Sequence, residues 1–458
     1  MPLRAMAADD AIARRCDAHL SALARLGRFS GTVEMRREGE VLFRGAYGTA
    51  DVARNVPCTN DTQFQIASLS KMFTAFAVLK ARDRGALRLE DPICRHVDSC
   101  PAQWGQVTIG QLLHHTSGIP DYEEALGLGS PAYMSFMREP DSSQRILARQ
   151  RPLPLDFAPG TKFHYSSTGY IILGTIVQRA ARMPLGTLLR RTVFDPCGMR
   201  DTGTIGLERP PRLAQGYEAP DIPWPQLLAG FRLGDVARAV APLSLTPPAG
   251  DAGLFSTAGD LMRWNDRMLH PDGKVMTAAL AREIIDGGAF GYGAGWVIGT
   301  DDARRRRFRH TGELPGYLSV STMYPDDGLT FAILTNFTRS RLSQIALALV
   351  AFANGKPYDP PASGNVVALT DMQRAALVGQ YRFADGDVMT VAPDPLGLSA
   401  AIPKRYTAGL IPLSPTRFYF PLADGTMTFA LGADGRASSV NARYSSTDHV
   451  AERITDAG

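Results

Sequence analysis

Strand patterns at both ends of the first 354 residues, separated by a long helical stretch, constrain the fold of this chain more than any other feature. Residues 29–48 alternate between apolar and polar and predict two strands joined by a turn at Glu38-Gly39. The middle third is helical and rich in loops, and residues 340–354 predict a further helix. Strands on both sides of a helical middle predict one sheet that is assembled from the two ends of this region and covered by helices. The later strands are predicted at residues 290–300, 308–310, 316–324 and 329–336.

A second domain is predicted after a short linker. Residues 355–366 are rich in proline and glycine, a composition typical of linkers between domains. Beyond them, residues 381–453 read as short strands with Asp-Gly turns that suit tight hairpins. We therefore predict an α/β domain of the α+β type, with a central antiparallel sheet flanked by helices, at residues 1–354. A lipocalin-like antiparallel β-barrel is predicted at residues 367–458.

The charge of the chain gives no reason to expect a nucleic-acid partner. Lys and Arg number 49 against 45 Asp and Glu, so the formal net charge is +4. The one dense basic run, residues 304–307, follows two aspartates and is interpreted as a solvated hairpin tip. No stretch approaches the ~20 apolar residues of a membrane span, so no transmembrane segment is expected. The sequence leaves the oligomeric state open.

The N-terminus and the cysteines bear on the cellular compartment. Ala5-Met6-Ala7 has the form of a signal cleavage site, but no apolar segment follows Arg4, so the start also reads as an alanine-rich helix. Cys94 and Cys100 flank a short segment, CRHVDSC, that a disulfide can close. The alternative is two unrelated buried thiols. Because a disulfide requires an oxidising compartment, we expect a periplasmic or secreted protein, with a cytoplasmic location as the alternative.

The strongest chemical signal is Ser68 followed by Lys71 in the segment FQIASLSKMFTAFAVL. Ser68 lies where a strand or loop meets a helix predicted over residues 68–84, so Lys71 follows one turn later on the same face. A serine hydroxyl is a poor nucleophile until a base removes its proton. A lysine that is held beside it and partly desolvated can have a lowered pKa and act as that base. The helix N-terminus also offers backbone N–H groups to a developing oxyanion.

Four more segments extend this signal along the chain. They are TIGQLLHHTSGIPDY at residues 108–122, APGTKFHYSSTGYIILG at 158–174, PAGDAGLFSTAGDLMRW at 248–264 and RHTGELPGY at 309–317. With IASLSKMFTA they resemble, in order, the serine β-lactamase and penicillin-binding-protein-like superfamily, specifically its class C β-lactamase-related esterases and D-peptidases. Five ordered motifs are far more specific than one. The resemblance implies a β-lactamase/transpeptidase-like fold from about residue 31 to residue 336. Because the histidines lack a framework of Cys or carboxylate ligands, no metal is expected, and no cofactor is expected either.

The resemblance also assigns chemical roles to three side chains. It implies that Ser68 is the nucleophile that becomes acylated, and that Lys71 is the general base or proton relay. Tyr165 matches the tyrosine of the Tyr-x-Asn motif, which exchanges a proton with the nucleophile or the leaving group. A tyrosine near two cations can titrate far below its reference value of ~10. The alternative is that Tyr165 is a packed aromatic and Tyr170 is the functional tyrosine.

The remaining predicted site residues lie on one strand and at one position that departs from the family pattern. His310-Thr311-Gly312 occupies the Lys-Thr-Gly position, and the backbone N–H of Glu313, with that of Ser68, is expected to form the oxyanion hole. Ser167 stands where the family usually has an asparagine, and its shorter side chain offers fewer hydrogen-bonding groups. The charge of His310 is conditional at neutral pH, so it anchors a substrate carboxylate less reliably than a lysine. Both departures argue against efficient β-lactam hydrolysis.

These features predict a serine hydrolase that acts through a Ser68 acyl-enzyme. The substrate is expected to be a small molecule or peptide with an ester or amide bond, which fits an esterase, a D-aminopeptidase or peptidase, or a weak β-lactamase. One alternative is an acyltransferase or peptide cyclase of the penicillin-binding-protein type. A second alternative is a degenerate member that binds peptidoglycan fragments without turnover. The sequence contains no Gly-x-Ser-x-Gly nucleophile elbow and no Walker-type phosphate loop.

Overall fold

The computed structural model describes residues 3–139, 142–208, 210–241, 250–394, 397–403, 405–444 and 447–454. The first two residues of the 248–264 segment lie outside the described residues. The chain forms two compact units, and each contains its own layer of strands. The domain boundaries derived from the sequence remain a prediction. The larger unit comprises residues 30–218 and 237–342, and the smaller unit comprises residues 1–29, 219–236 and 343–458.

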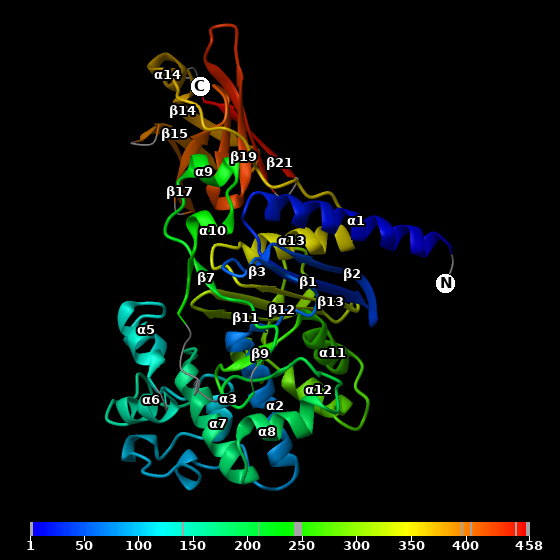
Figure 1. The fold of residues 1–458 in the computed structure, drawn as a ribbon. Coiled ribbons are helices and arrows are strands. Elements are labelled where there is room, and N and C mark those ends of the chain that lie inside the picture. Colours follow the sequence, from blue (N-terminus) through cyan, green and yellow to red (C-terminus); the bar gives the residue numbers. More distant parts are fainter. Residues whose placement is uncertain are drawn as a thin grey trace. The chain divides into compact units, whose positions relative to one another are not determined.

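The larger unit contains a six-stranded antiparallel sheet in the order β10-β11-β12-β13-β1-β2. The early strand β1 (Gly31–Arg37) pairs with the late strand β13 (Leu329–Thr335), with Val33 opposite Ile333. Figure 1 shows the blue strand β1 beside the olive strand β13. This pairing confirms the prediction of a central antiparallel sheet assembled from both ends of the region. The other strands are β2 (Glu40–Tyr47), β10 (Val297–Thr300), β11 (Arg306–Leu314) and β12 (Tyr317–Tyr324).

The strand predicted at residues 290–300 is wrong over its first half. A short 3₁₀ helix, η5 (Gly288–Phe290), occupies the start of this segment, and β10 begins only at Val297. Gly291 and Gly295 have φ values of 68° and 82°. These values lie in the left-handed region, which an extended strand does not use. The glycines therefore override the aromatic residues that suggested a strand.

Helix α2 (Ser70–Asp83) runs through the interior of the larger unit. Its residues 70–79 are all buried, which explains why that stretch carries a single charge, at Lys71. Helices α7 (Ser167–Ala181) and α8 (Leu185–Leu189) pack against α2 (Figure 1). The start of α2 is therefore held firmly, and it fixes the position of the residues around Ser68.

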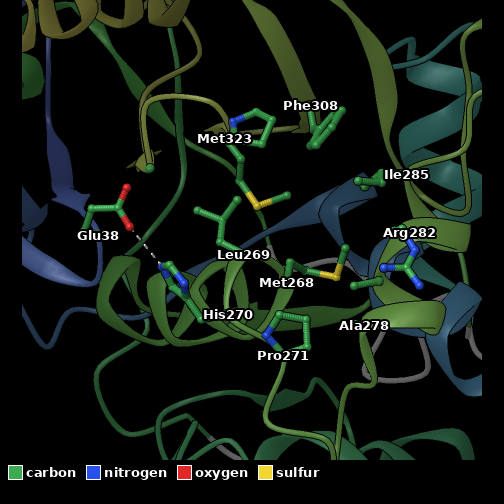
Figure 2. Close-up of a pocket in the computed structure, with 13 residues that line it drawn as sticks. Glu38, Met268, Leu269, His270, Pro271, Ala278, Arg282, Ile285, Phe308 and Met323 are labelled. Atoms are coloured by element: carbon green, nitrogen blue, oxygen red, sulfur yellow. Dashed lines mark ion pairs between the residues drawn. The ribbon is translucent and has the colours of Figure 1, made fainter.

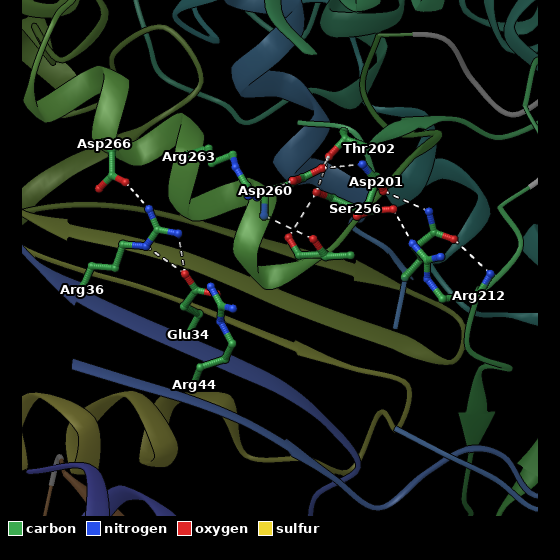
Figure 3. A network of polar contacts seen from close by, with 12 residues as sticks. Glu34, Arg36, Arg44, Asp201, Thr202, Arg212, Ser256, Asp260, Arg263 and Asp266 are labelled. Atoms are coloured by element: carbon green, nitrogen blue, oxygen red, sulfur yellow. Dashed lines mark hydrogen bonds and ion pairs between the residues drawn. The ribbon is translucent and has the colours of Figure 1, made fainter. Parts of the chain in front are cut away.

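A polar network joins the sheet to helix α11 (Ala258–Leu269), which packs on β1 and β13. Glu34 on β1 is only 1% exposed and accepts hydrogen bonds from Arg36, at 2.8 and 2.6 Å, and from Arg44 on β2, at 2.7 Å. Arg36 also forms an ion pair with Asp266 on α11. Figure 3 shows these side chains converging between the sheet and the helix. The two guanidinium groups compensate a carboxylate that burial would otherwise disfavour.

The smaller unit contains a closed barrel of eight strands, β14 to β21, which confirms the predicted C-terminal barrel. Along β16 (Gly397–Ile402) every second side chain is buried, as expected when alternate residues fill the interior of a small barrel. The Asp-Gly pair at residues 385–386 lies between β14 and β15, where the sequence predicts a tight turn. The remaining barrel strands are β14 (Gly379–Phe383), β15 (Val388–Asp394), β17 (Tyr406–Pro412), β18 (Arg417–Phe420), β19 (Gly425–Leu431), β20 (Ala437–Tyr444) and β21 (Thr447–Arg453).

The other elements are mostly short. None of the helices in the described part of the chain is long and apolar enough to cross a bilayer. The other α-helices are α1 (Leu3–Arg25), α3 (Ile109–Leu113), α4 (Tyr122–Leu126), α5 (Pro131–Arg138), α6 (Ser142–Gln150), α9 (Trp224–Ala229), α10 (Leu233–Val236), α12 (Ala278–Ile284), α13 (Leu342–Ala353) and α14 (Asp371–Leu377). The remaining helical turns are η1 (Ala67–Leu69), η2 (Ile93–Arg95), η3 (Ala102–Trp104), η4 (Arg190–Phe194) and η6 (Pro421–Ala423). The remaining strands are β3 (Thr49–Asp51), β4 (Val56–Pro57), β5 (Phe64–Gln65), β6 (Gly203–Thr204), β7 (Tyr217–Glu218), β8 (Arg238–Ala239) and β9 (Leu254–Ser256).

Cys94 and Cys100, which the sequence suggests as partners, are joined by a disulfide in the structure, with their Cα atoms 5.3 Å apart. The bond closes the loop of residues 94–100, which begins within η2. The other three cysteines, Cys16, Cys58 and Cys197, are free and buried.

Candidate active site

Ser68 lies on the 3₁₀ turn η1, which leads directly into α2. The preceding residue, Ala67, has a φ of 48°, a left-handed conformation that costs energy for any residue with a Cβ. Ala67 and Leu69 are 1% and 0% exposed, whereas Ser68 is partly exposed. The turn therefore presents the Ser68 hydroxyl outward from a buried backbone, as a nucleophile requires.

The Lys71 ammonium group is completely buried and fully hydrogen-bonded. Its Nζ donates to Oγ of Ser68 at 3.0 Å, to Oγ of Ser167 at 3.1 Å and to the carbonyl oxygen of Asp251 at 3.2 Å. An ammonium group has three N–H donors and no acceptor. All three donors are therefore used, and the arrangement suits the charged form of the lysine.

The pKa of Lys71 shifts in the opposite direction to the one expected from the sequence. Burial favours the neutral amine, but Tyr165, Asp251 and Glu123 outweigh it and together raise the pKa of Lys71 above its usual value. The expectation of a lowered pKa is therefore wrong for the free enzyme. The reason is that two acidic side chains from other parts of the chain lie close to this ammonium group.

Tyr165 lies beside Lys71, with its ring centroid 5.1 Å from Nζ. Burial raises the pKa of the Tyr165 hydroxyl above its usual value, although Lys71 opposes the shift. The expectation that two nearby cations lower this pKa is not met, so Tyr165 is a phenol in the free enzyme. Tyr170 is fully buried and donates a hydrogen bond to the carbonyl of Leu113 at 3.0 Å. The hydroxyl of Tyr170 is thus used in a structural hydrogen bond, which favours Tyr165 as the functional tyrosine.

Asp121 brings Ser167 and Glu123 together because its carboxylate caps two helices. Its Oδ1 accepts the backbone N–H groups of Glu123 and Glu124 at the start of α4, at 2.8 and 3.3 Å. Its Oδ2 accepts the backbone N–H of Ser167 at the start of α7. Carboxylates are favoured at both helix N-termini. The shared cap sets the Ser167 hydroxyl 2.9 Å from Oε2 of Glu123, to which it donates a hydrogen bond.

The acidic side chains around Lys71 are absent from the set of site residues predicted from the sequence. Asp251 is fully buried, and burial raises its pKa to about 7, while its Oδ2 accepts a hydrogen bond from the Tyr122 hydroxyl at 2.9 Å. Glu123 is partly exposed and contacts Ser167. Asp251 lies inside the 248–264 segment that carries the family resemblance, and Glu123 directly follows the 108–122 segment. An acidic residue within or beside such a segment is the signal that could have identified them.

His310, on strand β11, has a neutral imidazole ring. It is 3% exposed, its Nδ1 donates to the carbonyl of Thr311 at 2.7 Å, and its Nε2 accepts from the Tyr292 hydroxyl at 3.0 Å. Nδ1 must carry the proton because a carbonyl oxygen only accepts. Burial and the charge of Lys71 lower the pKa of His310 to about 3. At neutral pH this side chain therefore offers no positive charge to a substrate carboxylate.

Strand β11 packs directly on η1 through Gly312. Gly312 is buried, whereas the side chains of Thr311 and Glu313 on either side of it are exposed. Ser319 on the neighbouring strand donates a hydrogen bond to the carbonyl of Ile66 at 2.9 Å, which holds η1 against the sheet. The predicted oxyanion-hole strand and the predicted nucleophile are therefore adjacent.

Replacing Gly312 with alanine is expected to reduce activity by displacing strand β11 from the nucleophile turn. A Cβ at this position would lie 2.4 Å from the carbonyl oxygen of Ile66 and 2.4 Å from Oγ of Ser319. Strand β11 would have to move away from the nucleophile turn, and misplacing reacting groups by about 1 Å costs about 100-fold in rate. Steady-state hydrolysis of a p-nitrophenyl ester measures the effect. Gly299→Ala is the matched control, because a Cβ there has no neighbour within 4 Å; equal kcat/KM for the two variants would contradict the prediction.

One further histidine and one cavity complete the surroundings. His115 is 1% exposed, accepts the backbone N–H of Ser166 at 3.0 Å and packs on Tyr165, with ring centroids 4.3 Å apart. Its role is to support the tyrosine. A separate cavity of about 280 Å³ is lined by apolar residues including Met268, Phe308 and Met323, and none of the predicted site residues borders it (Figure 2).

The sequence is similar to those of three proteins with named functions. The chain is 28% identical over 427 residues to penicillin-binding protein 4* of Bacillus subtilis, covering 90% of this chain and 92% of that protein. It is 31% identical over 361 residues to the esterase EstB of Burkholderia gladioli, covering 71% and 90% of the two chains. It is 28% identical over 384 residues to a D-aminopeptidase of Gluconobacter oxydans, covering 81% and 66%.

A solved structure and a family model agree with these relatives. The octameric penicillin-binding protein homologue from Pyrococcus abyssi superimposes with a TM-score of 0.63 at 20% identity, covering 94% of this chain and 97% of that chain, which establishes a shared fold. The model of the beta-lactamase family matches residues 17–354, a span that includes every predicted site residue. The chain therefore belongs to the beta-lactamase family, whose relatives here include an esterase and a D-aminopeptidase.

Proposed function

We propose that this protein is an active serine hydrolase that cleaves ester or amide bonds through an acyl-enzyme on Ser68. The observation that carries the proposal is the 3.0 Å hydrogen bond between Lys71 Nζ and Oγ of a partly exposed Ser68. A serine hydroxyl held against a buried lysine at the start of a helix has the geometry of a nucleophile that is activated once the lysine gives up a proton. An esterase and a D-aminopeptidase among the relatives support chemistry on esters and on amides.

The other site residues receive complementary roles in this proposal. Tyr165, as a phenol beside Lys71, is placed to give a proton to the leaving group. The backbone N–H groups of Ser68 and Glu313 would bind the oxyanion, and the packing of β11 on η1 supports this pairing. The neutral state of His310 disfavours substrates that rely on a cation at this position to hold a carboxylate, as in penicillins. Neutral esters and amides are therefore the preferred substrates.

Intact-mass spectrometry tests the proposal. Incubation with a p-nitrophenyl ester, a D-amino-acid amide or a penicillin is expected to add the mass of the acyl group to the intact protein. Proteolytic digestion of the adduct is expected to place this mass on the peptide that contains Ser68. The ester or the amide is expected to acylate the protein faster than the penicillin. Absence of any adduct and of any turnover with all three compounds would instead indicate a degenerate binding protein.

We also propose a periplasmic or secreted location. The support is the Cys94–Cys100 disulfide, since such bonds persist in oxidising compartments. Thiol titration of protein isolated from each cell fraction, with alkylation before lysis, distinguishes this location from a cytoplasmic one.

A further inference from the structure

The hydrogen bonds of Lys71 raise a question about proton transfer in the proposed hydrolysis. All three of its N–H groups donate to oxygen acceptors, at 3.0, 3.1 and 3.2 Å. In that state the nitrogen has no lone pair with which to remove the Ser68 proton. A base at this position must therefore release one proton before it can accept another. The structure contains a continuous hydrogen-bonded route that would carry this proton away from Ser68 to a carboxylate.

The route runs through Ser167 to Glu123. Lys71 Nζ donates to Oγ of Ser167 at 3.1 Å, and the Ser167 hydroxyl in turn donates to Oε2 of Glu123 at 2.9 Å. We propose that Glu123 receives, through the Ser167 hydroxyl, the proton that Lys71 gives up before it deprotonates Ser68. The inference rests on the proposed function, because it concerns the acylation step of that reaction. Glu123 touches no reacting atom and acts only through the two residues between it and Ser68.

The proton transfers balance without any added reagent. Ser167 passes its hydroxyl proton to Oε2 of Glu123 and takes one from Nζ of Lys71, which leaves a neutral carboxylic acid, an unchanged hydroxyl and a neutral amine. The amine then accepts the Oγ proton of Ser68 as Oγ forms its bond to the substrate carbonyl carbon. When the leaving group departs, it takes a proton from the site, and the proton held by Glu123 can return along the same route. Two opposite charges are removed from a buried site, which burial favours.

The departure from the family motif at position 167 fits this role. A hydroxyl both donates and accepts, so it can pass a proton on while keeping its own structure. The amide side chain of an asparagine has separate donor and acceptor atoms and does not exchange its protons readily. Ser167 is fully buried, and its backbone is fixed by Asp121 at the start of α7. We therefore interpret Ser167 as the group that connects Lys71 to Glu123, and not as a shorter replacement for a substrate-binding asparagine.

The neighbouring acids are less suited to receive this proton. Lys71 contacts Asp251 only through its backbone carbonyl, and the Asp251 carboxylate accepts from Tyr122 instead. Asp121 uses both oxygens to accept backbone N–H groups from two helices. Glu123 alone among these three joins the Lys71 hydrogen-bond chain through its side chain.

The surroundings of Glu123 favour a carboxyl group that accepts a proton readily. Burial, and then the charge of Asp121, raise the pKa of Glu123, while Lys71 and the hydrogen bond from Ser167 lower it; the net direction is upward. A raised pKa favours the protonated form of the Glu123 carboxyl group, which is the form that the relay produces. The titratable groups that face Glu123 are Lys71 on α2, Asp121 and Tyr122 at the start of α4, Tyr133 on α5, Tyr165 before α7 and Asp251 before β9.

The pH dependence of acylation tests the relay. In the wild-type protein, acylation by p-nitrophenyl butyrate is expected to rise through the ionisation of Glu123 and to be level across neutral pH. In Glu123→Gln, acylation requires Lys71 to lose its proton to solvent. The acid limb of the profile, which is the pH range over which the acylation rate rises, is therefore expected to move up by at least about one pH unit. The rate at neutral pH should fall by about 10- to 100-fold and approach wild type at high pH. Stopped-flow release of p-nitrophenol between about pH 5 and about pH 10 gives these profiles.

Two further variants make the result decisive. Ser167→Ala removes the link but keeps both titratable groups, so it should shift the acid limb in the same direction, and the double variant should add little. Glu124→Gln is the matched control, since this exposed neighbour on α4 pairs with His164 instead; its profile should be that of wild type. An unshifted acid limb in both Glu123→Gln and Ser167→Ala, or a parallel drop at every pH, would overturn the relay. Failure of the wild-type protein to form any acyl adduct would instead overturn the proposed function.

Discussion

Replacing Ser68 with alanine is expected to lower turnover of an activated ester by at least about 10⁴-fold and to abolish the covalent adduct. The oxygen that forms the acyl bond is removed, and the hydroxyls that remain beside Lys71 are those of Ser167 and Tyr165. The Ser167 hydroxyl also contacts Nζ, but it is fully buried at the start of α7 and a substrate cannot reach it. Intact mass and steady-state rates, measured on the same preparation, check both parts of the result.

Ser70→Ala provides the matched control for this experiment. Ser70 lies two residues further along, is 1% exposed and only accepts the backbone N–H of Leu254 at 3.3 Å. Its loss is expected to leave most of the activity and the full adduct. Comparable losses in both variants would show that the region tolerates no substitution, and an adduct that persists in Ser68→Ala would show that the nucleophile is another residue.

Replacing Glu34 with alanine is expected to destabilise the larger unit by about 3 kcal/mol. Glu34 is 1% exposed and accepts three hydrogen bonds from Arg36 and Arg44. Without it, the largely buried Arg36 keeps only Asp266 as a carboxylate partner. An uncompensated charge at a helix–sheet contact costs far more than a lost surface pair. Urea denaturation followed by tryptophan fluorescence measures the change, because Trp104, Trp264 and Trp296 are buried in this unit.

Arg44→Ala separates the loss of an ion pair from the burial of a charge. The Arg44 side chain is 44% exposed, so its removal should cost no more than about 1 kcal/mol. The buried Glu34 keeps Arg36 in that variant. A denaturation midpoint for Glu34→Ala equal to that of Arg44→Ala would contradict the argument that burial, rather than pairing, sets the size of the effect.

The sequence predicted the sheet and the barrel because both depend on local patterns, whereas the roles of the site residues come from the family resemblance and stay a prediction. Alternating strands and Asp-Gly turns are readable within a few residues, and the strand pairing of β1 with β13 follows from their shared place around a helical middle. The Ser68–Lys71 contact at 3.0 Å follows from one turn of helix. The same approach failed at residues 290–300, where glycine conformations rather than side-chain pattern decide the structure.

The protonation state of the site could not be predicted in this way. The pKa of Lys71 depends on Glu123 and Asp251, which come from segments far along the chain and meet Lys71 only in the folded protein. Burial alone gives the wrong direction for the lysine, and the assumption of two cations gives the wrong direction for Tyr165, whose pKa burial raises despite the opposing charge of Lys71. Directions of pKa shifts depend on the sum of several opposing neighbours, and a sequence does not show which neighbours are present.

The double cap made by Asp121 has a consequence for local stability. Because one carboxylate holds the first turns of both α4 and α7, neither helix start can open without releasing the other. Opening would separate Glu123 from Ser167 and, in the same event, Ser167 from Lys71. The residues around the lysine therefore form a single cooperative unit in local unfolding, and intermediate states with half of this arrangement are disfavoured. A site organised in this way is either fully assembled or absent.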